Sequence, residues 1–123
     1  MKVVYESEKV RLLCTSLKAA KKHFGGNEML ASKLFARINS LEQAPTIKDI
    51  VVQQNLHFHN LANKDKKNLD GYFAIDIAGR KFPWRLIIQP LDKSEVPFEP
   101  CRIDEIASMV EVVKIVGVSN HYD

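Results

Sequence analysis

Cysteine is scarce in this chain, and long apolar runs are missing. The 123 residues include two cysteines, Cys14 and Cys101, which stand far apart and form no Cys-x-x-Cys motif. The first residues, MKVVYESEKVRLL, hold no apolar run of the length that a signal peptide needs, and no segment approaches the roughly 20 apolar residues of a membrane span. We therefore expect a cytoplasmic protein with two free thiols, and a disulfide between them is the less favoured alternative.

Internal repeats and low-complexity tracts are missing as well. Hydrophobic residues make up 46% and charged residues 27% of the chain, which is typical of a globular protein. The length suits one domain over residues 1–123, large enough to bury a modest core without help from a metal or a disulfide. The net charge of +3 is unremarkable, so the local placement of charge is more informative than its sum.

Apolar periodicity predicts helices first and strands afterwards. A short strand over residues 3–5 precedes a helix that Ser7 caps and that Gly25-Gly26 ends, and a second helix runs from a cap at Asn27 to a point before Pro45. We expect a helical turn near residues 46–49 and another within 103–109, a loop over 90–100, and strands over 56–61, 72–78, 82–89 and 110–118. This order predicts an α+β domain in which two N-terminal helices pack on a mainly antiparallel sheet.

The hairpin over residues 72–89 has two different faces. With a turn centred on Gly79 and Arg80, alternation places seven apolar residues on the face that meets the helices. They are Phe73, Ile75, Ile77, Phe82, Trp84, Leu86 and Ile88. The other face carries Tyr72, Ala74, Asp76, Arg85, Ile87 and Gln89. Arg85 either reaches outward past the small Ala74 to bind a ligand or pairs with Asp76 on an exposed sheet face, and the sequence favours neither.

Histidines and basic residues gather around this hairpin. His57 and His59 lie two apart on a predicted strand and so share a face, but a metal site needs a third ligand and only His121 is an obvious candidate. His57 is expected to be structural, whereas His59 directly precedes a basic loop, where a base beside a phosphate would be useful. Two basic clusters can hold phosphates, although a solvated loop is the commoner reason for such a lysine run. They are Lys64, Lys66 and Lys67, and Arg80, Lys81 and Arg85.

Five short segments follow one another in the C-terminal half: His59-Asn60-Leu61, the basic loop at 64–67, Gly71-Tyr72-Phe73-Ala74-Ile75, Trp84-Arg85-Leu86 and Asn120-His121-Tyr122. In the order and spacing of these segments, the C-terminal half resembles the HigB branch of the RelE/ParE superfamily of bacterial toxins. The N-terminal helices agree with the family in order only. The tail carries its imidazole and phenol in the reverse of the family order, and the insertion over residues 90–109 is longer than in compact members.

The resemblance implies a small twisted RelE-like sheet, backed by two helices, whose concave face binds RNA. It implies the toxin of a type II toxin–antitoxin system: a ribosome-dependent mRNA endoribonuclease that uses no metal or other cofactor and in which the ribose 2′-OH attacks the adjacent phosphate. The partners would be mRNA, the ribosome and a cognate helix-turn-helix antitoxin of the HigA type, in a cytoplasmic hetero-oligomer away from membranes. Two alternatives stay open, a ParE-like inhibitor of DNA gyrase that cuts no RNA and an inactive homologue that only binds its antitoxin.

The resemblance also assigns roles to individual residues. His59 and His121 are the candidates for proton transfer, Arg85 would stabilise the scissile phosphate, and Tyr122 would stack on a base or orient the phosphate. Six further residues are candidates for RNA binding: Lys64, Lys66, Lys67, Arg80, Lys81 and Tyr72.

Overall fold

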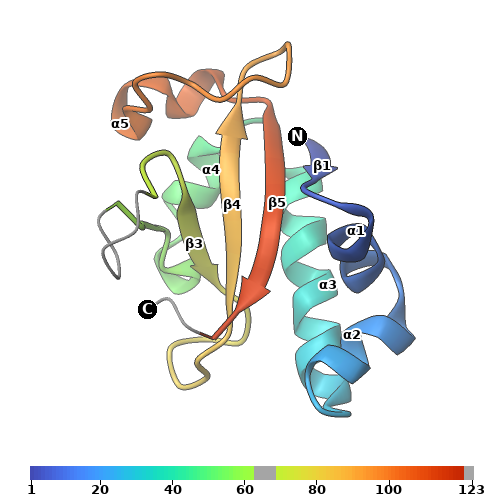
Figure 1. Cartoon of the computed structure of the whole chain (residues 1–123). Coiled ribbons are helices and arrows are strands. Elements are labelled where there is room, and N and C mark those ends of the chain that lie inside the picture. The colour runs from blue at the N-terminus through green and yellow to red at the C-terminus, as the bar shows by residue number, and fades with distance from the viewer. Residues whose placement is uncertain (63–68, 121–123) are drawn as a thin grey trace.

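A five-stranded sheet forms the centre of the computed structural model, which describes residues 1–62 and 69–120 (Figure 1). The strands lie in the order β1-β5-β4-β3-β2. Their bounds are β1 Lys2–Tyr5, β2 His59–Asn60, β3 Phe73–Asp76, β4 Arg85–Leu91 and β5 Val112–Ser119. β1 pairs with β5 in parallel and the other neighbours are antiparallel, so the predicted α+β fold with a mainly antiparallel sheet is confirmed.

The helices pack on one side of this sheet, with α3 and α4 running behind it (Figure 1). Their bounds are α1 Glu8–Thr15, α2 Leu17–His23, α3 Glu28–Gln43, α4 Lys48–Val51 and α5 Ile103–Ile106, with 3₁₀ turns η1 at Gln54–Leu56 and η3 at Ala107–Met109. None of the helices within residues 1–62 and 69–120 is long and apolar enough to cross a membrane.

The first predicted helix is divided in two. Ser16 leaves the helical conformation, with φ −116° and ψ 120°, and its hydroxyl accepts a hydrogen bond from the backbone N–H of Ala19 at 3.3 Å. A serine hydroxyl competes with the helical backbone in this way, so Ser16 ends α1 and caps α2. The predicted caps at Ser7 and Asn27 are confirmed by their side-chain hydrogen bonds.

The core lies between α3 and the hairpin face that the sequence predicts to be apolar. The α3 stripe is fully confirmed as buried: Leu30, Leu34, Ile38 and Leu41. It joins one apolar cluster with buried residues of the three central strands, which are Phe73, Ile75, Leu86, Ile88, Val113, Ile115 and Val118. Both faces of the hairpin are therefore assigned correctly.

The register of the hairpin differs from the prediction by two residues. Ile75 pairs with Leu86 and Phe73 with Ile88, because the connection between the strands is longer than a two-residue turn. Pro83 has no N–H for the ladder, and the loop closes instead through a 3.3 Å hydrogen bond from the N–H of Ile77 to the carbonyl of Trp84. A shift of two residues preserves the faces, since the side-chain period of a strand is two.

Two predicted boundaries are wrong near the hairpin. The strand expected over residues 56–61 is only the two-residue β2, because η1 and a left-handed His57 precede it. Conversely, Pro90 belongs to β4 and lies opposite Val113, although the sequence places it in a loop. The helical turns near residues 46–49 and 103–109 and the last strand are confirmed.

Candidate active site

Five charged or titratable residues meet at one end of the β2–β3–β4 side of the sheet. We call them the His/Arg cluster: His57, His59, Asp76, Arg80 and Arg85. β2 supplies His59, the end of β3 supplies Asp76 and the start of β4 supplies Arg85. Arg80 comes from the β3–β4 loop, so segments distant in sequence converge because the hairpin pairs Asp76 directly with Arg85.

His57 reaches the cluster through an unusual backbone conformation. Its φ of 49° and ψ of 53° are left-handed, which is uncommon for a residue with a side chain and typical of functional or tightly packed positions. The prediction that His57 and His59 share a strand face is therefore wrong. Their rings nevertheless lie together, with centroids 4.3 Å apart and planes inclined by 36°.

His59 has a defined tautomer. Its Nδ1 lies 2.8 Å from the backbone carbonyl of His57, and because a carbonyl only accepts, Nδ1 carries the proton. The lone pair of the neutral ring is then on Nε2. That nitrogen is buried and has no hydrogen-bond partner among the described residues, which makes it a candidate proton acceptor.

Arg85 points into the molecule and not outward. Its Nε lies 3.2 Å from Oδ1 of Asp76, and both side chains are 1% exposed. Its Nη1 donates to the carbonyls of Phe82 at 2.6 Å and Trp84 at 2.9 Å. Of the two alternatives left open by the sequence, the pairing with Asp76 is the one observed, and the pair is buried where the sequence places it on an exposed face.

The centre of the predicted RNA-binding face is covered by apolar side chains. Leu61 packs with Ala74 and Ile87 of that face in a second, small apolar cluster. Three half-buried hydrophobic residues pack against this cluster: Leu69, Tyr72 and Val116. The centre of the sheet face is therefore closed, and the exposed groups of the His/Arg cluster lie at its end.

His57 lies between charges of opposite sign. Nη1 of Arg80 is 2.8 Å from its Nε2 and also contacts its Nδ1, while Oδ1 of Asp76 is 3.7 Å from Nδ1. Burial lowers the pKa of His57 below the ordinary 6.5, the neighbouring His59 and the guanidinium groups of Arg80 and Arg85 act in the same direction, and Asp76 opposes them. Together these effects favour the neutral form of the His57 imidazole.

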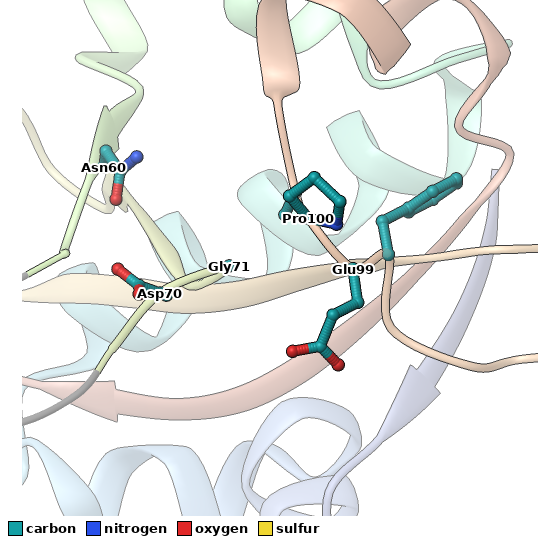
Figure 2. A pocket seen from close by; sticks show the side chains of 7 residues that line it. Asn60, Asp70, Gly71, Glu99 and Pro100 are labelled. Atoms are coloured by element: carbon teal, nitrogen blue, oxygen red, sulfur yellow. The ribbon is translucent and has the colours of Figure 1, made fainter.

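A pocket of about 420 Å³ lies at the other end of β2 (Figure 2). Asn60, Asp70 and Gly71 line one side, and Phe98, Glu99, Pro100 and Cys101 of the long β4–α5 connection line the other. The carboxylates of Asp70 and Glu99 disfavour a phosphate here and suit a ligand with amino or amide donors. Burial raises the pKa of the Cys101 thiol, so Cys101 is a poor nucleophile.

The structure describes part of the predicted site. It brings His59, Arg85 and Arg80 into one cluster, whereas Lys81 is exposed and Tyr72 packs in the second apolar cluster. Five predicted residues lie outside the described residues: Lys64, Lys66, Lys67, His121 and Tyr122.

Sequence reasoning missed the functional potential of two residues, His57 and Asp76. Their interaction depends on the left-handed backbone of His57 and on the burial of Asp76, and no local sequence pattern predicts either feature. The cross-strand pairing of Asp76 with Arg85 is the sequence feature that could have indicated the site, but the sequence analysis considers it only as an exposed ion pair.

Comparison with family models, curated proteins and solved structures finds no match to this chain. Within residues 1–62 and 69–120, no group of three or more His, Cys, Asp or Glu side chains could hold a metal ion. A function must therefore be argued from the His/Arg cluster itself.

Proposed function

We propose that this protein is the toxin of a type II toxin–antitoxin system, a ribosome-dependent endoribonuclease that cuts mRNA in the cytoplasm. One observation carries the proposal: the imidazole of His59 lies in a cluster with two guanidinium groups, and its Nε2 has no hydrogen-bond partner within residues 1–62 and 69–120. Self-cleavage of an RNA phosphodiester needs a base, an acid and cations, and amino-acid side chains can supply all three.

His59 acts as the base in the proposed reaction. The step requires the ribose to reach the buried Nε2 of His59. Nε2 takes the proton of the 2′-OH, and the oxygen forms a bond to the adjacent phosphorus while the bond from phosphorus to the 5′ oxygen breaks. The leaving oxygen takes a proton from an acid, giving a 2′,3′-cyclic phosphate and a 5′-hydroxyl. DNA lacks the attacking hydroxyl, so the substrate is RNA.

Arg80 is the guanidinium best placed to meet a phosphate. It is exposed, and a guanidinium fork suits two phosphate oxygens. Arg85 is buried and neutralised by Asp76, so we assign it mainly to holding the cluster together. His121 and Tyr122 remain predicted participants, as do the lysines of the basic loop in contacts with mRNA or the ribosome.

The proposed partners follow from the same resemblance: mRNA, the ribosome and a HigA-like helix-turn-helix antitoxin in a hetero-oligomer. The second candidate is an inactive homologue that binds only its antitoxin. The closed sheet face and the neutralised Arg85 are the observations that favour it, because both reduce the positive charge open to RNA.

Mapping of mRNA 5′ ends after brief induction tests the proposal. We expect wild type to arrest translation and to produce new ends within translated codons. His59→Gln should reduce these ends by about 100-fold or more, the usual effect of losing a general base. Lys93→Ala is the control, since Lys93 is exposed near the opposite end of β4 and should not affect cutting.

Other outcomes select the alternatives. Filamentation with DNA damage and no new RNA ends would favour the gyrase inhibitor. Normal growth would favour the inactive homologue. Equal cutting by wild type and a folded His59→Gln variant would contradict the role given to His59.

A further inference from the structure

We propose that His57 is the acid that protonates the leaving 5′ oxygen, and that an RNA phosphate activates it by drawing Arg80 away from the imidazole. The inference rests on the proposed function. It adds a second proton-transfer residue and states that phosphate binding controls the protonation of this residue. It makes substrate binding and proton delivery one event at the end of β3.

The contact between Arg80 and His57 favours a neutral ring. Nη1 of Arg80 is 2.8 Å from Nε2 and also contacts Nδ1, so it approaches both nitrogens of the ring. A guanidinium has donors and no acceptor, and in a neutral imidazole one of these two nitrogens can accept. A protonated His57 has no lone pair to offer and repels the guanidinium, so the contact opposes protonation of the ring.

Asp76 is positioned to stabilise the protonated ring once Arg80 has moved. Its Oδ1 lies 3.7 Å from Nδ1 of His57, closer to a weak charge contact than to a hydrogen bond. Neither carboxylate oxygen has a hydrogen-bond partner among the described residues, although the side chain is 1% exposed. A buried carboxylate without hydrogen bonds is costly, so an N–H donor from His57 would be favourable.

Four charged or titratable groups face His57 from the elements around it: His59 from β2, Asp76 from β3, Arg80 from the β3–β4 loop and Arg85 from β4. Burial, His59 and the two guanidinium groups lower the pKa of His57, and Asp76 raises it. Arg80 is exposed whereas Arg85 is buried, so an incoming phosphate meets Arg80 first. The phosphate brings negative charge and occupies the guanidinium, and both effects raise the pKa of His57.

The proton balance follows from this arrangement. In the complex His57 takes a proton from solvent and holds it against Asp76, and it gives that proton to the 5′ oxygen as the bond to phosphorus breaks. His59 takes the proton of the 2′-OH through Nε2. The ring centroids are 4.3 Å apart, so both imidazoles can serve one phosphodiester. Exchange with water then restores both rings.

The first test measures the pKa of His57 by NMR titration of its ring protons, without any cleavage. The probe is a deoxydinucleotide, which has the phosphodiester and lacks the 2′-OH. We expect saturating probe to raise the pKa of His57 in the wild type. Arg80→Ala should raise the pKa in the absence of probe, and the probe should then add less. Lys81→Ala is the matched control, because it removes the same charge one residue away and should change the pKa less than Arg80→Ala does.

Two results would overturn the inference. One is the same pKa of His57 in wild type and Arg80→Ala, which would show that the contact does not control protonation. The other is no change in the wild type with deoxydinucleotide up to millimolar concentration, which would show that no phosphate displaces Arg80. Neither variant removes a buried group, so both should fold.

A second readout separates this inference from the proposed function. Under single-turnover conditions, His57→Ala should slow RNA cleavage by about 100-fold and remove the loss of rate on the alkaline side of the pH profile. If the wild type cuts no RNA while its His57 pKa responds to Arg80 and the deoxydinucleotide, the proposed function fails and the phosphate control of His57 stands. If RNA is cut and the pKa of His57 responds neither to Arg80→Ala nor to the deoxydinucleotide, the phosphate control of His57 fails and the proposed function stands.

Discussion

Asp76→Asn should be among the most destabilising single substitutions outside the apolar core. Asp76 and Arg85 are each 1% exposed, with Oδ1 and Nε 3.2 Å apart, so the pair is held away from water. Breaking a buried ion pair by removing one partner costs about 3–5 kcal/mol, because the remaining charge loses its counter-charge. Arg85 keeps its two bonds to backbone carbonyls, which places the expected loss near the lower end, about 3 kcal/mol.

A loss of this size is large for a single domain, whose total stability is commonly about 5–15 kcal/mol. The melting temperature should fall by about 10 °C, and urea unfolding followed by circular dichroism gives the free energy directly. Glu99→Gln is the matched control, since it removes one carboxylate charge at an exposed position and should stay within about 0.5 kcal/mol of the wild type.

A double variant shows whether the cost comes from the unpaired charge. Asp76→Leu combined with Arg85→Met removes both charges, and apolar replacement of a buried pair is often neutral, so it should recover most of the stability lost by Asp76→Asn. An Asp76→Asn variant within about 1 kcal/mol of the wild type would refute the reasoning, because a desolvated pair cannot be broken at so small a cost.

Two further substitutions test the core. Leu34→Ala, at a fully buried position of α3, should lower the free energy of unfolding measured in urea by about 2–5 kcal/mol. Leu12→Ala, at an exposed position of α1, should lower it by less than about 1 kcal/mol, and equal losses would contradict the packing of α3. Burial raises the pKa of the Cys14 thiol to about 12 from 9.0, so as the pH rises through this range the unfolded chain loses the proton first. The free energy of unfolding should therefore fall with rising pH above about 9 more steeply in the wild type than in Cys14→Ala, and equal slopes would contradict the burial of this thiol.

Local chemistry explains which parts of the fold were predictable. The caps at Ser7 and Asn27 depend on hydrogen bonds to residues three positions further along the chain, and the apolar stripe of α3 depends on helical periodicity. Both features can therefore be predicted from the sequence. The faces of the hairpin are equally legible, since they follow from alternation alone. The break at Ser16 was missed because apolar periodicity continues across it while the hydroxyl ends the helix.

Non-local geometry explains what was not predictable. The register of the hairpin depends on how the loop containing Pro83 closes, and a shift of two residues leaves the apolar pattern unchanged. The direction of Arg85 depends on its buried ion pair with Asp76 and on its hydrogen bonds to two backbone carbonyls of the hairpin. His57 joined the candidate site through a left-handed backbone, which nothing in its neighbouring residues indicates.

We propose that the His/Arg cluster cuts RNA through the ribose 2′-OH. The decisive experiment uses purified protein, ribosomes and a defined message carrying a single 2′-deoxynucleotide at the mapped cleavage position. The unmodified message should give 2′,3′-cyclic phosphate and 5′-hydroxyl ends, and the deoxy position should stay intact. Cleavage at the deoxy position, or products with 5′-phosphate ends, would contradict the proposal.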